Sequence, residues 1–127
     1  MNQEIIDKYK ISFENKILSS KLSGNIVYKN IKINNNVIDE FLVDWSDPEE
    51  IDELLIPDIK AVMNGDNSLI ENGSETISID IEPVYVTFYK KEIGEATYPK
   101  IPTIDFLEII EAWRDFLLQA PLNGSSA

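Results

Sequence analysis

The sequence predicts an α+β domain with a mainly antiparallel β-sheet and two principal helices, one between strands and one C-terminal helix that packs on the sheet. Short segments alternate apolar and polar residues between turn residues, which is typical of strands. Two other stretches repeat apolar residues every three or four positions, as on a helix face. A chain of 127 residues that is 43% hydrophobic can bury one core. We therefore expect one domain over residues 1–118 and a frayed tail over 119–127.

Two periods fit residues 1–22. Ile5, Tyr9, Phe13 and Ile17 recur every four residues, as in a helix, whereas Tyr9, Ile11 and Phe13 alternate with polar residues, as in a strand. Helix and strand both remain open here, and the later part favours a strand.

A second strand is expected after Gly24. Its apolar residues change parity at Lys29-Asn30, which predicts a bulge or bend at that point. Asparagines 34–36 form a turn signal, and the run from Val37 to Trp45 reads as a further strand, so we expect a hairpin there.

Helix-start signals follow in Asp47-Pro48-Glu49-Glu50, which supply an N-cap carboxylate, a proline at the first helical position and a capping-box glutamate. Pro57 should kink or split this helix, which ends at Asn64-Gly65. The apolar face of the helix comprises Ile51, Leu54, Leu55, Ile59 and Val62.

The second half begins with a hairpin turn predicted at Asn72-Gly73. The strand after it buries Ile77, Ile79 and Ile81, and Glu82-Pro83 marks a bulge or the break between two strands. Beyond the break, Val84, Val86 and Phe88 share one face. Tyr85, Thr87 and Tyr89 share the other, which is either an exposed contact surface or is covered by a helix.

The last helix is expected from a Thr103 cap to about Leu118. Its buried stripe comprises Phe106, Ile109, Ile110, Trp113, Phe116 and Leu117, and its water-facing residues are Glu108, Glu111, Arg114 and Asp115.

The absence of histidine and cysteine removes the commonest general base, the usual zinc ligands and the usual catalytic triads, so we expect no enzyme, metal or cofactor. Neither a secretory signal nor a membrane span is visible, which favours a cytoplasmic protein.

The net charge is −12, divided into +3 over residues 1–35 and −15 over 36–127. This charge disfavours nucleic acid and membranes and favours a basic protein partner.

One segment is strongly acidic and contains a tryptophan beside the acids. It is either a solvated helix face with a cap or a recognition surface for a basic partner. A calcium loop is disfavoured, because the spacing lacks the alternate ligands and central glycine of an EF-hand. The candidate partner-binding residues are Asp39, Glu40, Asp44, Trp45, Asp47, Glu49, Glu50, Asp52, Glu53 and Asp58.

Several short motifs, spread over residues 31–118, resemble small bacterial immunity proteins. They are Ile31-Lys32-Ile33, Glu40-Phe41, Trp45-Ser46, Asn64-Gly65, Ser68-Leu69-Ile70, the strand from Val84 to Tyr89, and the closing segment 102–117. Such proteins inhibit the toxins of contact-dependent growth inhibition and related polymorphic toxin systems. The resemblance implies a non-catalytic inhibitor that binds and neutralises one cognate toxin domain, often a basic nuclease.

Two other functions stay open. One is an acidic nucleic-acid mimic or regulatory adaptor that occupies the basic groove of a nucleic-acid enzyme. The other is a carboxylate-based hydrolase, which needs two acids in one pocket.

Overall fold

The structure is a computed structural model that describes residues 2–20, 24–90 and 98–119. It confirms an α+β fold with antiparallel sheets and a C-terminal helix packed on the larger one. The elements run in the order α1 (Gln3–Tyr9), β1 (Ser12–Ser20), β2 (Gly24–Lys32), α2 (Asn36–Asp44), α3 (Pro48–Glu50), η1 (Ile51–Leu55), α4 (Ile56–Met63), β3 (Ile70–Gly73), β4 (Ile77–Ile81), β5 (Tyr85–Lys90), β6 (Lys100–Pro102) and α5 (Thr103–Leu118).

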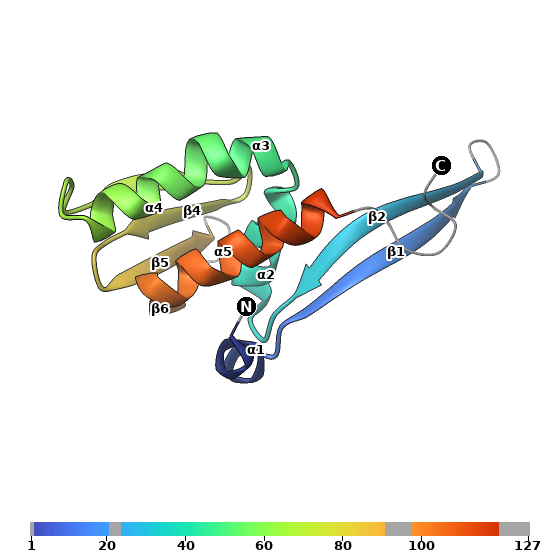
Figure 1. The fold of residues 1–127 in the computed structure, drawn as a ribbon, viewed down its shortest axis with the longest axis horizontal. Coiled ribbons are helices and arrows are strands. Elements are labelled where there is room, and N and C mark those ends of the chain that lie inside the picture. Colours follow the sequence, from blue (N-terminus) through green and yellow to red (C-terminus); the bar gives the residue numbers. More distant parts are fainter. Residues whose placement is uncertain (1, 21–23, 91–97, 120–127) are drawn as a thin grey trace.

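The larger sheet has the strand order β3-β4-β5-β6, and every neighbouring pair is antiparallel. Helices α4 and α5 lie side by side over one of its faces (Figure 1). The alternation predicted for β4 is confirmed, because Ile77, Ile79 and Ile81 are all buried. The chain turns between β4 and β5, where the Glu82 N–H donates to the Tyr85 carbonyl oxygen at 3.0 Å, so the strand break is confirmed rather than the bulge.

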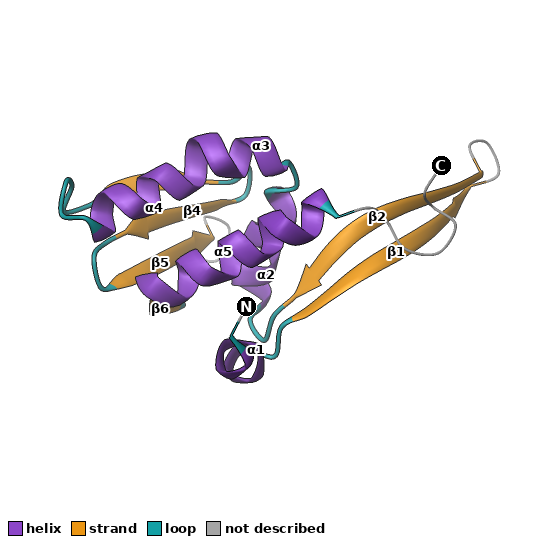
Figure 2. Ribbon diagram, viewed as in Figure 1, coloured by secondary structure: helices purple, strands orange, loops and turns teal. Residues whose placement is uncertain are grey.

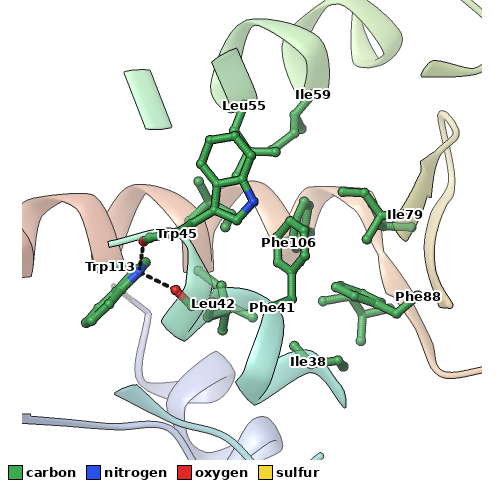
Figure 3. Packing of buried hydrophobic residues seen from close by; sticks show 14 of the residues in the cluster. Ile38, Phe41, Leu42, Trp45, Leu55, Ile59, Ile79, Phe88, Phe106 and Trp113 are labelled. Atoms are coloured by element: carbon green, nitrogen blue, oxygen red, sulfur yellow. Dashed lines mark hydrogen bonds between the residues drawn. The ribbon is translucent and has the colours of Figure 1, made fainter. Parts of the chain in front are cut away.

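The core lies between this sheet and the helices, and aromatic rings fill its centre (Figure 3). Phe88 of β5 meets both Phe41 of α2 and Phe106 of α5 edge to face, with ring centroids 5.6 Å apart in each pair. Edge-to-face contact is the arrangement that aromatic quadrupoles favour. Strand β5 and helices α2 and α5 therefore share a single core.

The N-terminal region contains both structures that its sequence allowed, since helix α1 ends at Tyr9 and strand β1 starts at Ser12. Strands β1 and β2 form a two-stranded hairpin that projects away from the rest of the molecule (Figure 2). Its register is unbroken from Ser12↔Lys32 to Ser20↔Gly24, so the predicted bulge is wrong. No bulge is needed, because Tyr28 lies on the exposed face of β2 while Ile31 lies on the buried one.

The prediction of a strand over 37–45 is wrong, because α2 occupies this segment. The Asn35 side chain accepts hydrogen bonds from the N–H groups of Val37 and Ile38, which starts a helix where a turn was expected. Ile38 and Phe41 both point into the core, as residues three apart in a helix can. The hairpin predicted between the strand after Gly24 and the segment 37–45 is therefore wrong, and β2 pairs with β1 instead.

Helices α3, η1 and α4 form the predicted helix between strands, and Asp47 caps it by accepting from the Glu49 N–H at 2.9 Å. Its middle is a π-helical turn in which the Ile56 N–H donates to the Ile51 carbonyl oxygen. A proline ring collides with the carbonyl four residues earlier in a regular α-helix. The wider turn relieves this clash at Pro57, so the expected interruption takes the form of a π turn.

The hairpin turn predicted at Asn72-Gly73 is wrong, because both residues lie in β3, and the chain reverses after them. The Ser74 N–H donates to the Ile77 carbonyl oxygen at 2.7 Å, so the turn comes just after the predicted position. Asn72 is held in the strand by its side chain, whose amide donates to the Leu54 carbonyl oxygen at 3.0 Å and to Asp58 at 2.9 Å.

Helix α5 extends to Leu118, as predicted, but Thr103 is its first residue and not its cap, since Pro102 holds that position. The Thr103 hydroxyl instead donates to the Glu82 carbonyl oxygen at 2.5 Å. The predicted stripe is confirmed as far as Trp113, with Phe116 and Leu117 half-buried at its end.

Of the four polar residues expected to face water, only Asp115 is exposed. Glu108, Glu111 and Arg114 are half-buried, because neighbouring elements cover the sides of α5. The predicted tail lies outside the described residues except for Gln119.

Candidate protein-binding surface

The acids of α2 are tied to the sheet and to nearby lysines. The Lys90 ammonium lies 2.7 Å from Glu40 Oε1, and the Thr76 hydroxyl lies within hydrogen-bonding distance of Glu40 and of Asp44 Oδ2, at 3.0 Å from the latter. The hydrogen bond from Lys90, followed by that from Thr76, lowers the pKa of Glu40. These contacts hold the N-terminal end of β4 against α2, so Glu40 and Asp44 have a structural role.

Asp39 is half-buried beside the start of the hairpin. Loss of hydration raises the pKa of its carboxyl group, and a backbone hydrogen bond at Ile33 and the charges of Lys32 and Lys16 oppose this rise. Asp39 therefore lies next to the basic N-terminal part of the chain.

Two further acids are engaged by long-range contacts. Asp52 of η1 accepts from the Arg114 guanidinium at 2.7 Å, which links η1 to α5, and Arg114 also lies 3.0 Å from Asp115. The bond to Asp52 is the main cause of a raised pKa of Arg114. Asp58 accepts from the Asn72 amide, which links α4 to β3.

Three of the candidate acids differ from the rest. Glu49, Glu50 and Glu53 are exposed, and their carboxylates form no hydrogen bond or ion pair within the described part of the chain. Glu49 and Glu50 lie in α3 and Glu53 lies in the adjoining π-helical turn, so all three belong to the start of one continuous helix. We call these residues the acidic ridge, since they place three negative charges, without a cation partner among the described residues, at the N-terminal end of the helix formed by α3, η1 and α4.

Trp45 is a core residue, with only 9% of its surface exposed. Its ring packs beside Phe41 at 6.2 Å, and its carbonyl oxygen accepts from Trp113 (Figure 3). It lies below the surface and is not available to a partner that docks on the acidic ridge.

The sheet face opposite the helices is only partly the exposed contact surface that the sequence allowed, because Tyr85 is exposed, Tyr89 is half-buried and Thr87 is buried. Tyr85 is 45% exposed, and Tyr89 packs against Tyr98 with ring centroids 4.7 Å apart. The Tyr89 hydroxyl donates to Asp80 at 2.9 Å, and this bond is the main cause of a raised pKa of Tyr89. Sequence reasoning missed Tyr98, because this residue lies before the short strand β6, where no alternation of apolar and polar residues reveals a strand face.

Among residues 2–20, 24–90 and 98–119, no group of three or more acidic side chains is placed to hold a metal ion. No helix in this part of the chain is long and apolar enough to cross a membrane. Comparison of the chain with protein-family models, with curated proteins and with solved structures gives no match.

Proposed function

We propose that this protein is a non-catalytic inhibitor that binds a basic protein, namely the cognate toxin domain of a polymorphic toxin system. The observation that carries the proposal is the acidic ridge, whose three carboxylates are exposed and have no cation partner among the described residues. Other candidate acids, such as Glu40 and Asp52, already have partners within the fold. The resemblance to immunity proteins supplies the identity of the partner.

The electrostatics of the acidic ridge also support a role in binding a basic partner. Like charges three and four positions apart repel one another and destabilise a helix slightly. The positive end of the helix dipole offsets part of this repulsion at Glu49 and Glu50, because they lie in the first turn. Facing a basic partner, the same charges accelerate association, by about 10-fold to 1000-fold at low salt.

The test uses the toxin domain encoded by the neighbouring gene and measures its association rate with this protein at low and high salt. The variant E49K/E50K/E53K should associate at least about 10-fold more slowly at low salt. A matched control is E4K/D66K/E75K, which makes the same change in net charge at exposed acids elsewhere. The control should slow association much less.

A second ridge variant, E49Q/E50Q/E53Q, removes the charges without placing lysines at the positive end of a helix. Thermal unfolding of each variant checks that its fold is intact. Equal effects of the ridge and control variants would remove the ridge from the binding surface. A neighbouring gene that encodes no toxin, together with no inhibition of any basic nuclease domain tested, would contradict the proposed function.

A further inference from the structure

A pocket of about 260 Å³ opens where the β4–β5 turn meets the start of β6. Thr103, the first residue of α5, holds the backbone of the β4–β5 turn in place. Its N–H donates to the Val84 carbonyl oxygen at 2.9 Å, and its hydroxyl donates to the Glu82 carbonyl oxygen. Thr103 itself is fully buried. The pocket is lined by Glu82, Pro83, Val84, Tyr85 and Lys100.

The Tyr85 ring in this pocket already has a cation beside it. The Lys100 ammonium lies 5.5 Å from the centroid of the ring, within the range of a cation–π contact. Lys100 is exposed and reaches Tyr85 across the strand pair β5–β6. The contact shows that the exposed ring face is accessible to a positively charged side chain.

A carboxylate, that of Glu82, also lines this pocket. Glu82 is exposed, and its carboxylate has no hydrogen bond or ion pair with any described residue. Val84 is 65% exposed and adds apolar surface at the rim. A carboxylate, an aromatic face and an apolar wall are the groups that bind the head and the stem of a long cationic side chain.

We propose that this pocket binds an arginine or lysine side chain of a basic protein partner. The Glu82 carboxylate supplies the counter-charge, the Tyr85 ring supplies a platform, and Lys100 is an internal competitor that the incoming cation displaces. The inference shares with the proposed function the premise of a basic partner. It concerns a different surface, because the pocket lies at the β4–β5 turn and the acidic ridge lies on α3 and η1.

The test uses the intact protein and a small probe, so it does not depend on any toxin. The backbone amide signals of the ¹⁵N-labelled protein are followed by NMR during titration with Nα-acetyl-argininamide, with Nα-acetyl-citrullinamide as the uncharged control. Shifts caused by the arginine probe alone should concentrate at residues 82–85 and 100. Shifts spread evenly over exposed acids, or caused equally by both probes, would overturn the proposal.

Two pairs of variants sharpen the test, each with a matched change in charge. K100Q should tighten binding of the arginine probe about 2-fold to 5-fold, because it removes the competing cation, whereas K60Q, at an exposed lysine of α4, should not. E82Q should weaken binding about 2-fold to 5-fold, and E53Q on the acidic ridge should leave it unchanged. Weaker binding by K100Q, or equal losses in E82Q and E53Q, would contradict the proposed site.

Failure of these titrations would leave the toxin association experiment unaffected. Conversely, a protein that ignores every toxin but binds the arginine probe at the pocket would retain the site and lose the proposed function.

Discussion

The indole Nε1 of Trp113 lies 2.8 Å from the carbonyl oxygen of Trp45 and donates a hydrogen bond to it. The same N–H lies 2.9 Å from the Leu42 carbonyl oxygen (Figure 3). Both carbonyl groups lie at the C-terminal end of α2, where carbonyl groups lack the regular α-helical partner, and the Leu42 carbonyl oxygen also accepts from the Trp45 N–H at 3.2 Å. One side chain of α5 therefore satisfies the end of α2 inside the core. The indole Nε1 of Trp45, in contrast, is buried without a hydrogen-bond partner among the described residues.

This contrast predicts different costs for the same substitution at two tryptophans. Trp113→Phe should lower the free energy of unfolding by about 2–4 kcal/mol, because it removes the donor to buried carbonyl groups and also leaves a cavity. Trp45→Phe removes a buried donor that has no partner among the described residues, so it loses ring volume but no hydrogen bond, and its cost should be smaller. Urea unfolding of both variants measures the difference. Equal losses would show that hydrogen bonding at Trp113 contributes nothing beyond ring packing.

The hydrogen bond from Tyr9 to Asp105 predicts a loss of stability at alkaline pH. The Tyr9 hydroxyl donates to Asp105 Oδ2 at 2.5 Å. Burial, followed by this bond and the charge of Asp105, raises the pKa of Tyr9 well above the ordinary tyrosine value of 10.0. The folded protein therefore keeps the proton above pH 10 while the unfolded chain releases it. The stabilisation is complete below pH 10 and declines as the pH rises through the folded-state pKa.

Tyr9→Phe should accordingly cost about 1–3 kcal/mol at neutral pH, since the lost bond is to a charged group. It should also flatten the dependence of stability on pH above 10, as measured by urea unfolding at several pH values. Tyr89→Phe is a useful comparison, because its hydroxyl also bonds to a carboxylate, at Asp80, but at a more exposed site. A wild-type protein that gains stability above pH 10 would contradict the role assigned to Tyr9.

Lys29 attaches the projecting hairpin to the last turn of α5. Its ammonium donates to the Phe116 carbonyl oxygen at 2.5 Å and also to that of Gln119, and desolvation lowers the pKa of Lys29. A cation at the C-terminal end of a helix satisfies free carbonyl groups and the helix dipole together. A two-stranded hairpin is only marginally stable without such support.

Lys29→Met keeps most of the side-chain stem but removes these bonds. We expect faster amide hydrogen exchange along β1 and β2, with little change in β4 and β5, whose stability comes from the main core. Lys32→Met is the matched control on the same strand, because the ammonium of Lys32 makes an exposed contact of 3.9 Å with Glu14 and a longer-range attraction to Asp39 but no bond to α5 among the described residues. Identical exchange in the two variants would show that Lys29 does not hold the hairpin.

Features with a strong local cause were predictable from the sequence. The start of α3 follows from the Asp47-Pro48 cap, and the buried face of β4 follows from three isoleucines at alternate positions. The segment 37–45 was misassigned because a short, largely apolar run fits a strand as well as a helix. Its state depends on the Asn35 cap and on the packing of Phe41 against Phe88 and Phe106, which come from later in the chain.

The sequence by itself determined the fold class, the separation of charge between the two parts of the chain and the run of acids from Asp39 to Asp58. Only the tertiary structure decided which of those acids remain free. Glu40 pairs with a lysine 50 positions away and Asp52 with an arginine 62 positions away, whereas the acidic ridge has no such cation within the described part of the chain. The physical reason is that helix caps and strand faces depend on near neighbours in the chain. An ion pair forms only where folding brings two distant side chains within a few ångströms of each other.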